Sequence, residues 1–192
     1  QFIRGLQGEH GGWPLFKGGD LDLSCTVKAY FALKAVGDSP DAAHMARARQ
    51  AILAAGGAAH ANVFTRIQLA LFGELPWTAV PVMPVEIMRL PRWFPFHLDQ
   101  VSYWSRTVIV PLLILMLLKP KARPPGALDL AALFLPSPFA APPPLRNPTG
   151  SRAGRCFLAL DRLLKKLEPH FPKGTRRRAV AAAVAFIVER LK

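Results

Sequence analysis

Hydrophobic residues recur at close to helical spacing through most of the chain, and short glycine-containing stretches separate the repeats. Between residues 24 and 36, Val27, Tyr30 and Phe31 follow this spacing, and Gly37 comes directly after the segment. Such spacing gathers apolar side chains on one face of a helix, and a glycine after the last turn is typical of a helix end. The same reasoning predicts helices over 24–36, 39–55, 62–72, 85–88, 102–118, 155–168 and 175–191.

Polar residues mark the starts of several of these helices. Ser39 or Asp41 is expected to cap the second helix and Thr175 the last, because their side chains can accept hydrogen bonds from unpaired backbone N–H groups. No window alternates convincingly between polar and apolar residues with period two, as a strand would. The pattern therefore predicts an all-α protein.

Two segments are too rich in proline to be regular helices. Residues 75–98 hold five prolines together with several aromatic residues, and 119–148 hold nine of the nineteen prolines in the chain. The first is expected to be a structured, packed connection and the second a linker or surface wrap. This divides the chain into a helical portion (1–118), a Pro-rich connection (119–154) and two amphipathic, basic helices of the same domain (155–192).

The charge is strongly basic and unevenly placed. The chain has 25 Lys and Arg against 12 Asp and Glu, a net charge of +13, and nine of those charges fall within residues 143–192. A basic excess of this size points to nucleic acid or an anionic membrane surface. Since the basic residues there are interleaved with Leu, Phe and Val, an amphipathic surface is favoured over a solvated tail.

Several classes of site find no support in the sequence. Cys25 and Cys156 are too far apart for a metal or disulfide pattern, which favours a reducing compartment. The five histidines lack metal-binding spacing and no nucleotide-binding glycine motif occurs, so no metal and no cofactor are expected. The longest apolar run, 108–118, is about half the length of a membrane span and is expected to be a core helix. The chain opens with Gln1 and without a leader pattern, so it is interpreted as a piece of a longer protein.

One glycine-rich turn carries a recognisable motif. Gln7, Gly11 and Trp13 form a Gln followed by Gly-x-Trp, which resembles the QW motif repeated in squalene–hopene and oxidosqualene cyclases. A Gln amide can hydrogen-bond the open end of a neighbouring helix, and Trp offers a flat surface for stacking. Further stretches resemble the N-terminal half of the same family, the bacterial squalene cyclases above all. These stretches are 11–15, 27–30, 63–66, 73–77, 84–88, 93–97, 102–106 and 159–162.

The resemblance implies a double-layered (α/α) helical barrel around an apolar cavity, of which this chain would be an incomplete part. The implied reaction is the cationic cyclisation of squalene to hopene and hopanol. Family members protonate squalene with a D-x-D-D motif in their C-terminal half. This chain lacks that motif, and the nearest approach is Asp20 and Asp22. No catalytic residue is therefore predicted here, and the isolated chain is expected to be inactive.

By resemblance, this half of the enzyme supplies cavity wall. Trp104 matches a position that lines the cavity and faces the developing cation in family members, and Phe64 is a second candidate. Aromatic faces attract cations. Lys28 and Gln68 depart from the acidic and aromatic residues that other members carry, which weakens the transfer of individual roles. Tyr30, Trp77, Trp93, Phe94 and Phe96 are expected to be packing residues.

Residues 157–167 form an amphipathic basic segment that is a candidate membrane contact. By resemblance it corresponds to the apolar plateau through which these peripheral, monotopic enzymes meet the cytoplasmic side of the cell membrane. Arg176, Arg177 and Arg178 could add to its charge. The alternative is that this helix only packs on the barrel. The residues assigned to the contact are Phe157, Leu160, Leu164, Leu167, Lys165 and Lys166.

Two functions from different classes follow. The first is a fragment of a membrane-associated squalene–hopene cyclase, with squalene and the membrane as partners, no nucleic acid, and a possible homodimer of the whole enzyme. The second is a non-enzymatic basic helical module that binds an anionic membrane or nucleic acid. A protein prenyltransferase-like barrel is a third possibility, but it would need zinc ligands that the sequence does not show.

Overall fold

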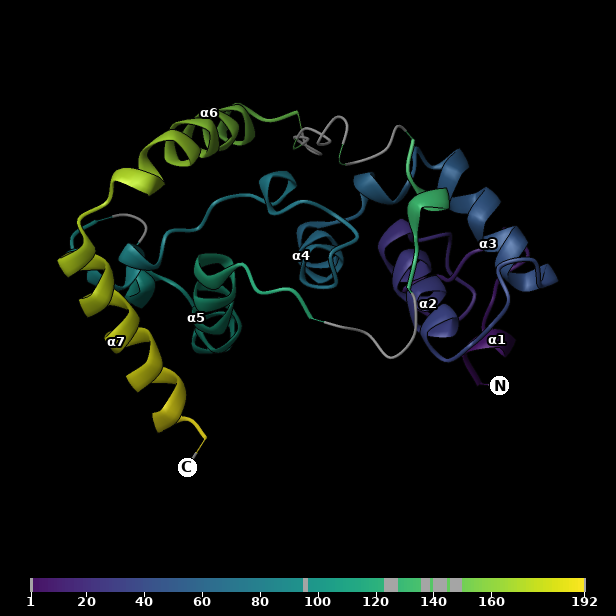
Figure 1. Ribbon diagram of the computed structural model, residues 1–192, viewed down its shortest axis with the longest axis horizontal. Helices are drawn as coiled ribbons and strands as arrows, with labels where there is room; N and C mark the ends of the chain where they lie inside the picture. The colour runs from purple at the N-terminus through teal and green to yellow at the C-terminus, as the bar shows by residue number, and fades with distance from the viewer. Residues whose placement is uncertain are drawn as a thin grey trace. The chain divides into compact units, whose positions relative to one another are not determined.

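The computed structural model describes residues 2–94, 97–122, 128–135, 139, 145 and 150–191, and within them it is helical. The α-helices are α1 (Phe2–Gly5), α2 (Leu23–Ala35), α3 (Ala43–Ala54), α4 (Val63–Leu71), α5 (Tyr103–Leu118), α6 (Arg152–Leu167) and α7 (Lys173–Glu189). The 3-10 helices are η1 (Ala58–His60), η2 (Trp77–Ala79), η3 (Val85–Arg89), η4 (Leu98–Gln100), η5 (Ala131–Leu133) and η6 (Glu168–His170). Over these ranges extended pairing is limited to one isolated bridge between Pro14 and Leu21. The all-α prediction is confirmed (Figure 1).

Backbone contacts divide the chain into two compact units. The first unit is Gln1–Val80 with Lys121–Arg146, and the second unit is Pro81–Pro120 with Asn147–Lys192. The predicted division at residues 118 and 154 separates segments by their sequence. The two compact units do not test it, and it stays a prediction.

In the first unit, α2 packs against α3 and α4. Tyr30, Met45, Ile52 and Leu69 are fully buried there, and Asn62 caps α4 by accepting a 2.9 Å hydrogen bond from the Thr65 N–H. The apolar faces that the spacing predicted for these helices therefore form the core of this unit.

A later part of the chain completes that core. Leu130 and Leu133 are buried, and the Glu74 carboxylate accepts a 2.8 Å hydrogen bond from the Leu130 N–H. Lys34 donates to the carbonyl of Asp129. The described residues 128–135 thus differ from the predicted linker or surface wrap, because two buried leucines and a hydrogen bond to the half-buried Glu74 hold them against the first unit.

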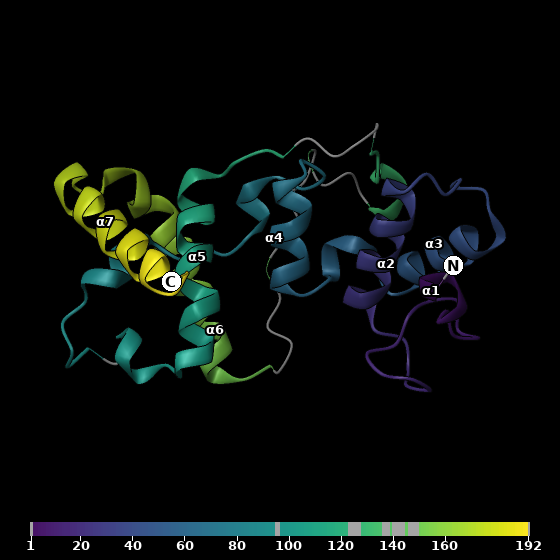
Figure 2. The same ribbon diagram turned by 90° about the horizontal axis from the view of Figure 1, so that it is seen from below.

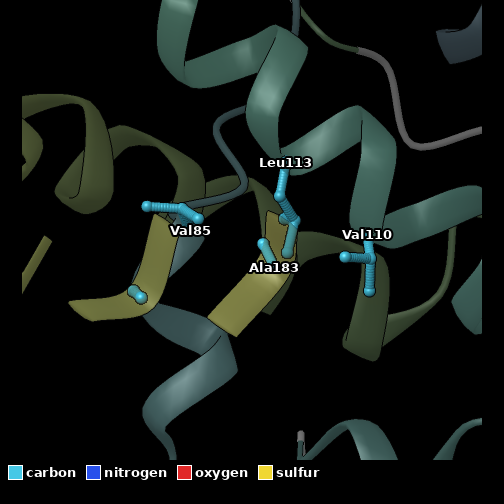
Figure 3. Packing of buried hydrophobic residues seen from close by; sticks show 5 residues of the cluster. Val85, Val110, Leu113 and Ala183 are labelled. Atoms are coloured by element: carbon cyan, nitrogen blue, oxygen red, sulfur yellow. The ribbon is translucent and has the colours of Figure 1, made fainter. Parts of the chain in front are cut away.

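The second unit is centred on α5 and α7, which pack against each other and against η3 (Figure 1 and Figure 2). Val85, Val110, Leu113, Ala179 and Ala183 form its buried cluster. Figure 3 shows Leu113 reaching from α5 toward Ala183 of α7. The small alanine side chains at i and i+4 of α7 leave room for the branched residues of α5.

Two predicted helix starts are wrong. Helix α3 begins at Ala43, and Ala42 in the cap position makes no side-chain hydrogen bond, so neither Ser39 nor Asp41 caps it. Helix α7 begins at Lys173 after Pro172, which leaves Thr175 inside the first turn. Several polar residues near each start could have served as the cap, and tertiary packing decides at which residue the helix begins.

Candidate functional site

From Val108 to Leu118 helix α5 carries only apolar side chains, yet the second unit fully buries only one side of it. Val110, Leu113 and Met116 are buried against the rest of the unit. On the other side, Trp104 is 78% exposed and Val108, one turn later, is 50% exposed. A helix that is apolar all round is normally buried all round, so the Trp104 side of α5 is an unpartnered apolar face within its unit.

The first residues of α5 carry two aromatic rings in contact. The rings of Tyr103 and Trp104 meet edge to face, with centroids 5.9 Å apart and planes at 77°. Ser102 caps the helix by accepting from the Ser105 N–H at 3.3 Å. Because this cap sets the first residue of α5, the two rings lie in the first turn of the helix.

Phe64 lies in the first unit, in the first turn of α4, and is 56% exposed. The structure therefore shows Phe64 and Trp104 as exposed aromatic residues of different units. A cavity of about 650 Å³ in the first unit, lined by residues 5–10 and 13–19, contains neither of them. The assignment of both residues to one substrate cavity stays a prediction.

The structure brings Gln7, Gly11 and Trp13 together. The Gln7 amide donates to the carbonyls of Gly11 at 2.7 Å and of His44, in the first turn of α3, at 2.8 Å. The buried Trp13 donates its indole N–H to the Ile3 carbonyl at 2.7 Å. This turn therefore ties α1 to α3, although its identity as the family's QW motif stays a prediction.

A buried carboxylate beside this turn was missed from the sequence. The side chain of Asp38 is almost fully buried; it accepts from the Arg4 Nε at 2.9 Å and lies 2.7 Å from the His44 Nε2. Hydrogen bonding to Arg4, followed by that to His44, lowers the pKa of Asp38 to about 2, although burial opposes the shift. Arg4 and Asp38 are 34 residues apart, so no local spacing could have signalled the pair.

Helix α6 turns a polar face toward its own unit. Asp161 is buried and accepts a 2.7 Å hydrogen bond from the Val82 N–H, and its second oxygen pairs with Lys165 at 2.9 Å. Leu158 lies on the same side and is half-buried. Lys165, assigned above to the membrane contact, is thus engaged with Asp161 on the inward side of the helix.

The outward face of α6 is apolar and is flanked by basic residues. Phe157, Leu160 and Leu167 are exposed, Leu164 is half-buried, and Leu163 is a further exposed leucine that the assignment omitted. The basic flank consists of exposed side chains, which are Arg155, Arg162 and Lys166. Within the second unit, the apolar stripe of α6 is not the packed face.

Comparison with known proteins decides the family. A family model described as Squalene-hopene cyclase N-terminal domain matches residues 1–192. The chain belongs to the squalene–hopene cyclase family. The squalene–hopene cyclase of Zymomonas mobilis is 56% identical over 191 residues, covering 100% of this chain. That of Bradyrhizobium diazoefficiens is 52% identical over 99% of the chain, and that of Alicyclobacillus acidocaldarius 36% identical over 96%.

The chain spans 29%, 29% and 28% of the lengths of these three squalene–hopene cyclases. Its all-helical structure is consistent with the helical N-terminal domain of the family. In the described ranges, no helix is long and apolar enough to cross a membrane, and no three His, Cys, Asp or Glu side chains are grouped so that they could hold a metal ion.

The structure also places other residues of this cyclase-family chain that the sequence singled out. Asp22 caps α2, accepting from the Cys25 N–H at 2.7 Å, and Lys28 is exposed on the same helix. Tyr30 is buried as predicted. Trp93 is 80% exposed and meets Phe94 in a T-shaped contact, so its assignment as a packing residue is wrong within this unit. Phe96 lies outside the described residues.

Proposed function

We propose that this chain is one part of a squalene–hopene cyclase, which cyclises squalene to hopene and hopanol, and that it supplies part of the cavity wall. The supporting observation is the apolar face of α5 that carries Trp104 and Val108. Exposed apolar surface of this kind marks a binding surface or a surface meant to be covered. In a cyclase, a hydrocarbon substrate and the remaining polypeptide would cover it.

Trp104 would act on the charge that moves through the substrate during ring closure. An indole face attracts a nearby cation by about 0.5–2 kcal/mol, and the ring of Trp104 is largely open. Phe64 would make a weaker contribution of the same kind from the first unit. Both contributions stabilise intermediates, and neither side chain can supply the proton that starts the reaction.

The proton would come from polypeptide that this chain does not include. Protonating an alkene requires a strong acid held away from water, and Asp22, the nearest match to an acidic motif, accepts a hydrogen bond from the Cys25 N–H as a helix cap. Asp38 is held ionised by Arg4, which makes it a poor proton donor. The chain alone would therefore be inactive.

A substitution at Trp104 in the full-length cyclase tests this function. Replacing Trp104 by Leu keeps an apolar side chain but removes the π face, so kcat is expected to fall roughly 3- to 30-fold. Trp104→Phe, which keeps a ring, should retain most of the rate. Conversion of squalene would be measured by gas chromatography of the products. Equal rates for Leu, Phe and wild type would contradict the cavity-wall role.

We also propose that α6 meets the membrane, on its cytoplasmic side, as a peripheral contact. Its outward leucines can enter the interfacial region while Arg155, Arg162 and Lys166 face anionic headgroups. Squalene is dissolved in the bilayer, so a membrane-facing surface would give the enzyme access to it.

Vesicle binding by the full-length protein tests the contact. Leu163→Glu places a charge in the apolar stripe and should weaken binding to vesicles that contain phosphatidylglycerol. The matched control is Ala159→Glu, which adds the same charge among the basic residues. Equal loss for both variants would indicate a purely electrostatic contact, as for a basic module that binds nucleic acid or headgroups alone.

Pairing of two whole enzymes remains a proposal that sedimentation analysis can test.

A further inference from the structure

The end of α7 places a cation against two aromatic rings. The guanidinium carbon of Arg190 lies 3.4 Å from the centroid of the Phe186 ring and 5.5 Å from that of the Tyr103 ring. Both distances are within the range of a cation–π interaction. Arg190 therefore joins the last turn of α7 to the first turn of α5.

Hydrogen bonds hold this guanidinium in place. Its Nη1 donates to the Phe186 carbonyl at 2.9 Å and to the Glu189 carboxylate at 3.1 Å. Its Nε is buried and has no hydrogen-bond partner within the described ranges. The charge of Arg190 is thus directed at the rings as well as at the two acceptors.

Tyr103 in turn contacts Trp104. The Tyr103 ring meets the Trp104 ring edge to face at 5.9 Å, so Arg190, Tyr103 and Trp104 form a continuous chain of contacts. Arg190 is the cation that occupies one face of the Tyr103 ring, whereas no cation lies against Trp104 among the described contacts.

We infer that Arg190 is a positioning residue, which fixes Tyr103 and through it Trp104, so that Trp104 and not Tyr103 presents its free face to a cationic intermediate. This inference rests on the proposed cyclase function. A carbocation beside Tyr103 would be repelled by the guanidinium, while the same charge on the open side of Trp104 would not have Arg190 in direct contact.

Kinetics of the full-length cyclase test the inference. Arg190→Met keeps the length of the side chain but removes the charge and the planar group. It is expected to lower kcat about 3- to 10-fold, to change KM by less than about twofold, and to raise the share of incompletely cyclised products. Arg190→Lys restores the charge and should recover part of the lost rate. The matched control is Arg92→Met, an exposed arginine of the same unit whose side chain is 90% exposed.

A double-substitution cycle separates positioning from general stability. If Arg190 acts through Tyr103, the loss for Arg190→Met combined with Tyr103→Leu should be no greater than for Tyr103→Leu alone. The near-ultraviolet circular dichroism of folded Arg190→Met should also change, because a Trp ring has moved. Thermal unfolding confirms that kcat refers to folded enzyme.

The outcomes distinguish the inference from the function beneath it. Unchanged kcat and products for Arg190→Met, while Trp104→Leu is impaired, would overturn the inference and leave the proposed function standing. Additive losses in the double variant, or an equal loss for Arg92→Met, would also overturn it. If Trp104→Leu itself had no effect, the proposed cavity wall would fail, and the inference with it.

Discussion

Asp161 is expected to be the main attachment of α6 to its unit, and removing its side chain should loosen the segment that it holds. Its Oδ1 accepts from the Val82 N–H at 2.7 Å and its Oδ2 pairs with Lys165 at 2.9 Å. A hydrogen bond to a charged group contributes about 1.5–3 kcal/mol, and a partly exposed i, i+4 ion pair adds about 0.3–0.5 kcal/mol. Asp161→Ala should therefore lower the free energy of local opening by about 2–3 kcal/mol.

Asp161→Asn separates the two contributions. The amide oxygen can still accept from the Val82 N–H as a neutral acceptor, but the attraction to Lys165 is lost. The neutral hydrogen bond that remains contributes about 0.5–1.5 kcal/mol, so the expected loss relative to wild type is about 1–2 kcal/mol. The ordering wild type, Asn, Ala is the specific expectation.

Hydrogen exchange of the full-length protein provides the assay. The first two residues of a peptide lose their label, and Pro81 and Pro84 have no backbone N–H, so a peptide covering 79–84 reports on Val82 and Met83 alone. A loss of 2–3 kcal/mol corresponds to exchange roughly 30- to 150-fold faster for Asp161→Ala. Arg162→Ala, one residue away and exposed, is the control. Exchange at wild-type rates in Asp161→Ala would refute the attachment, and equal acceleration throughout α5 would show a global effect instead.

Three further predictions concern stability. The pKa of Asp38 is lowered to about 2 in the folded protein, below its ordinary value of 3.8. Its ionised form therefore stabilises the fold above about pH 4, and this contribution disappears as the pH falls toward 2. Between pH 5 and pH 2.5, the urea midpoint should fall less steeply in Asp38→Asn than in wild type. Leu113→Ala should lower the free energy of unfolding by about 2–5 kcal/mol, whereas Leu118→Ala, at an exposed site, should change it by less than about 0.5 kcal/mol; equal effects in denaturant titrations would contradict the described core. Gly11 has a φ of 82°, so Gly11→Ala should cost about 1–2 kcal/mol, while Gly174→Ala, in the open first turn of α7, should be neutral or stabilising by up to about 1 kcal/mol; thermal unfolding of the two variants should move in these different directions.

The helices were predictable because each carries its own apolar periodicity. Helices α2, α4 and α5 lie within one residue of their predicted bounds. Helix α6 begins at Arg152, three residues before the expected start, because Ser151 accepts a hydrogen bond from the Gly154 N–H at 3.0 Å. Local spacing thus identifies a helix, while its first residue depends on which cap is free to bond.

The remaining features depend on contacts between distant residues. The pairing of Arg4 with Asp38 and the hydrogen bond from the Leu130 N–H to Glu74 join positions 34 and 56 residues apart, and neither leaves a local pattern. The inward direction of Lys165 also follows from its partner Asp161, although a helical wheel places it among basic residues. The family resemblance drew attention to Trp104, but only the structure shows that the apolar face around it has no partner within its unit.

Photo-crosslinking tests the central claim most directly, which is that the Trp104 face of α5 lines the chamber that holds squalene. The full-length cyclase would be loaded with a squalene analogue that carries a photoreactive diazirine, irradiated and digested, and the modified peptides identified by mass spectrometry. The account predicts adducts on the peptide that contains Trp104 and Val108, and their suppression by excess squalene. Adducts confined to other peptides, with α5 unmodified, would contradict it.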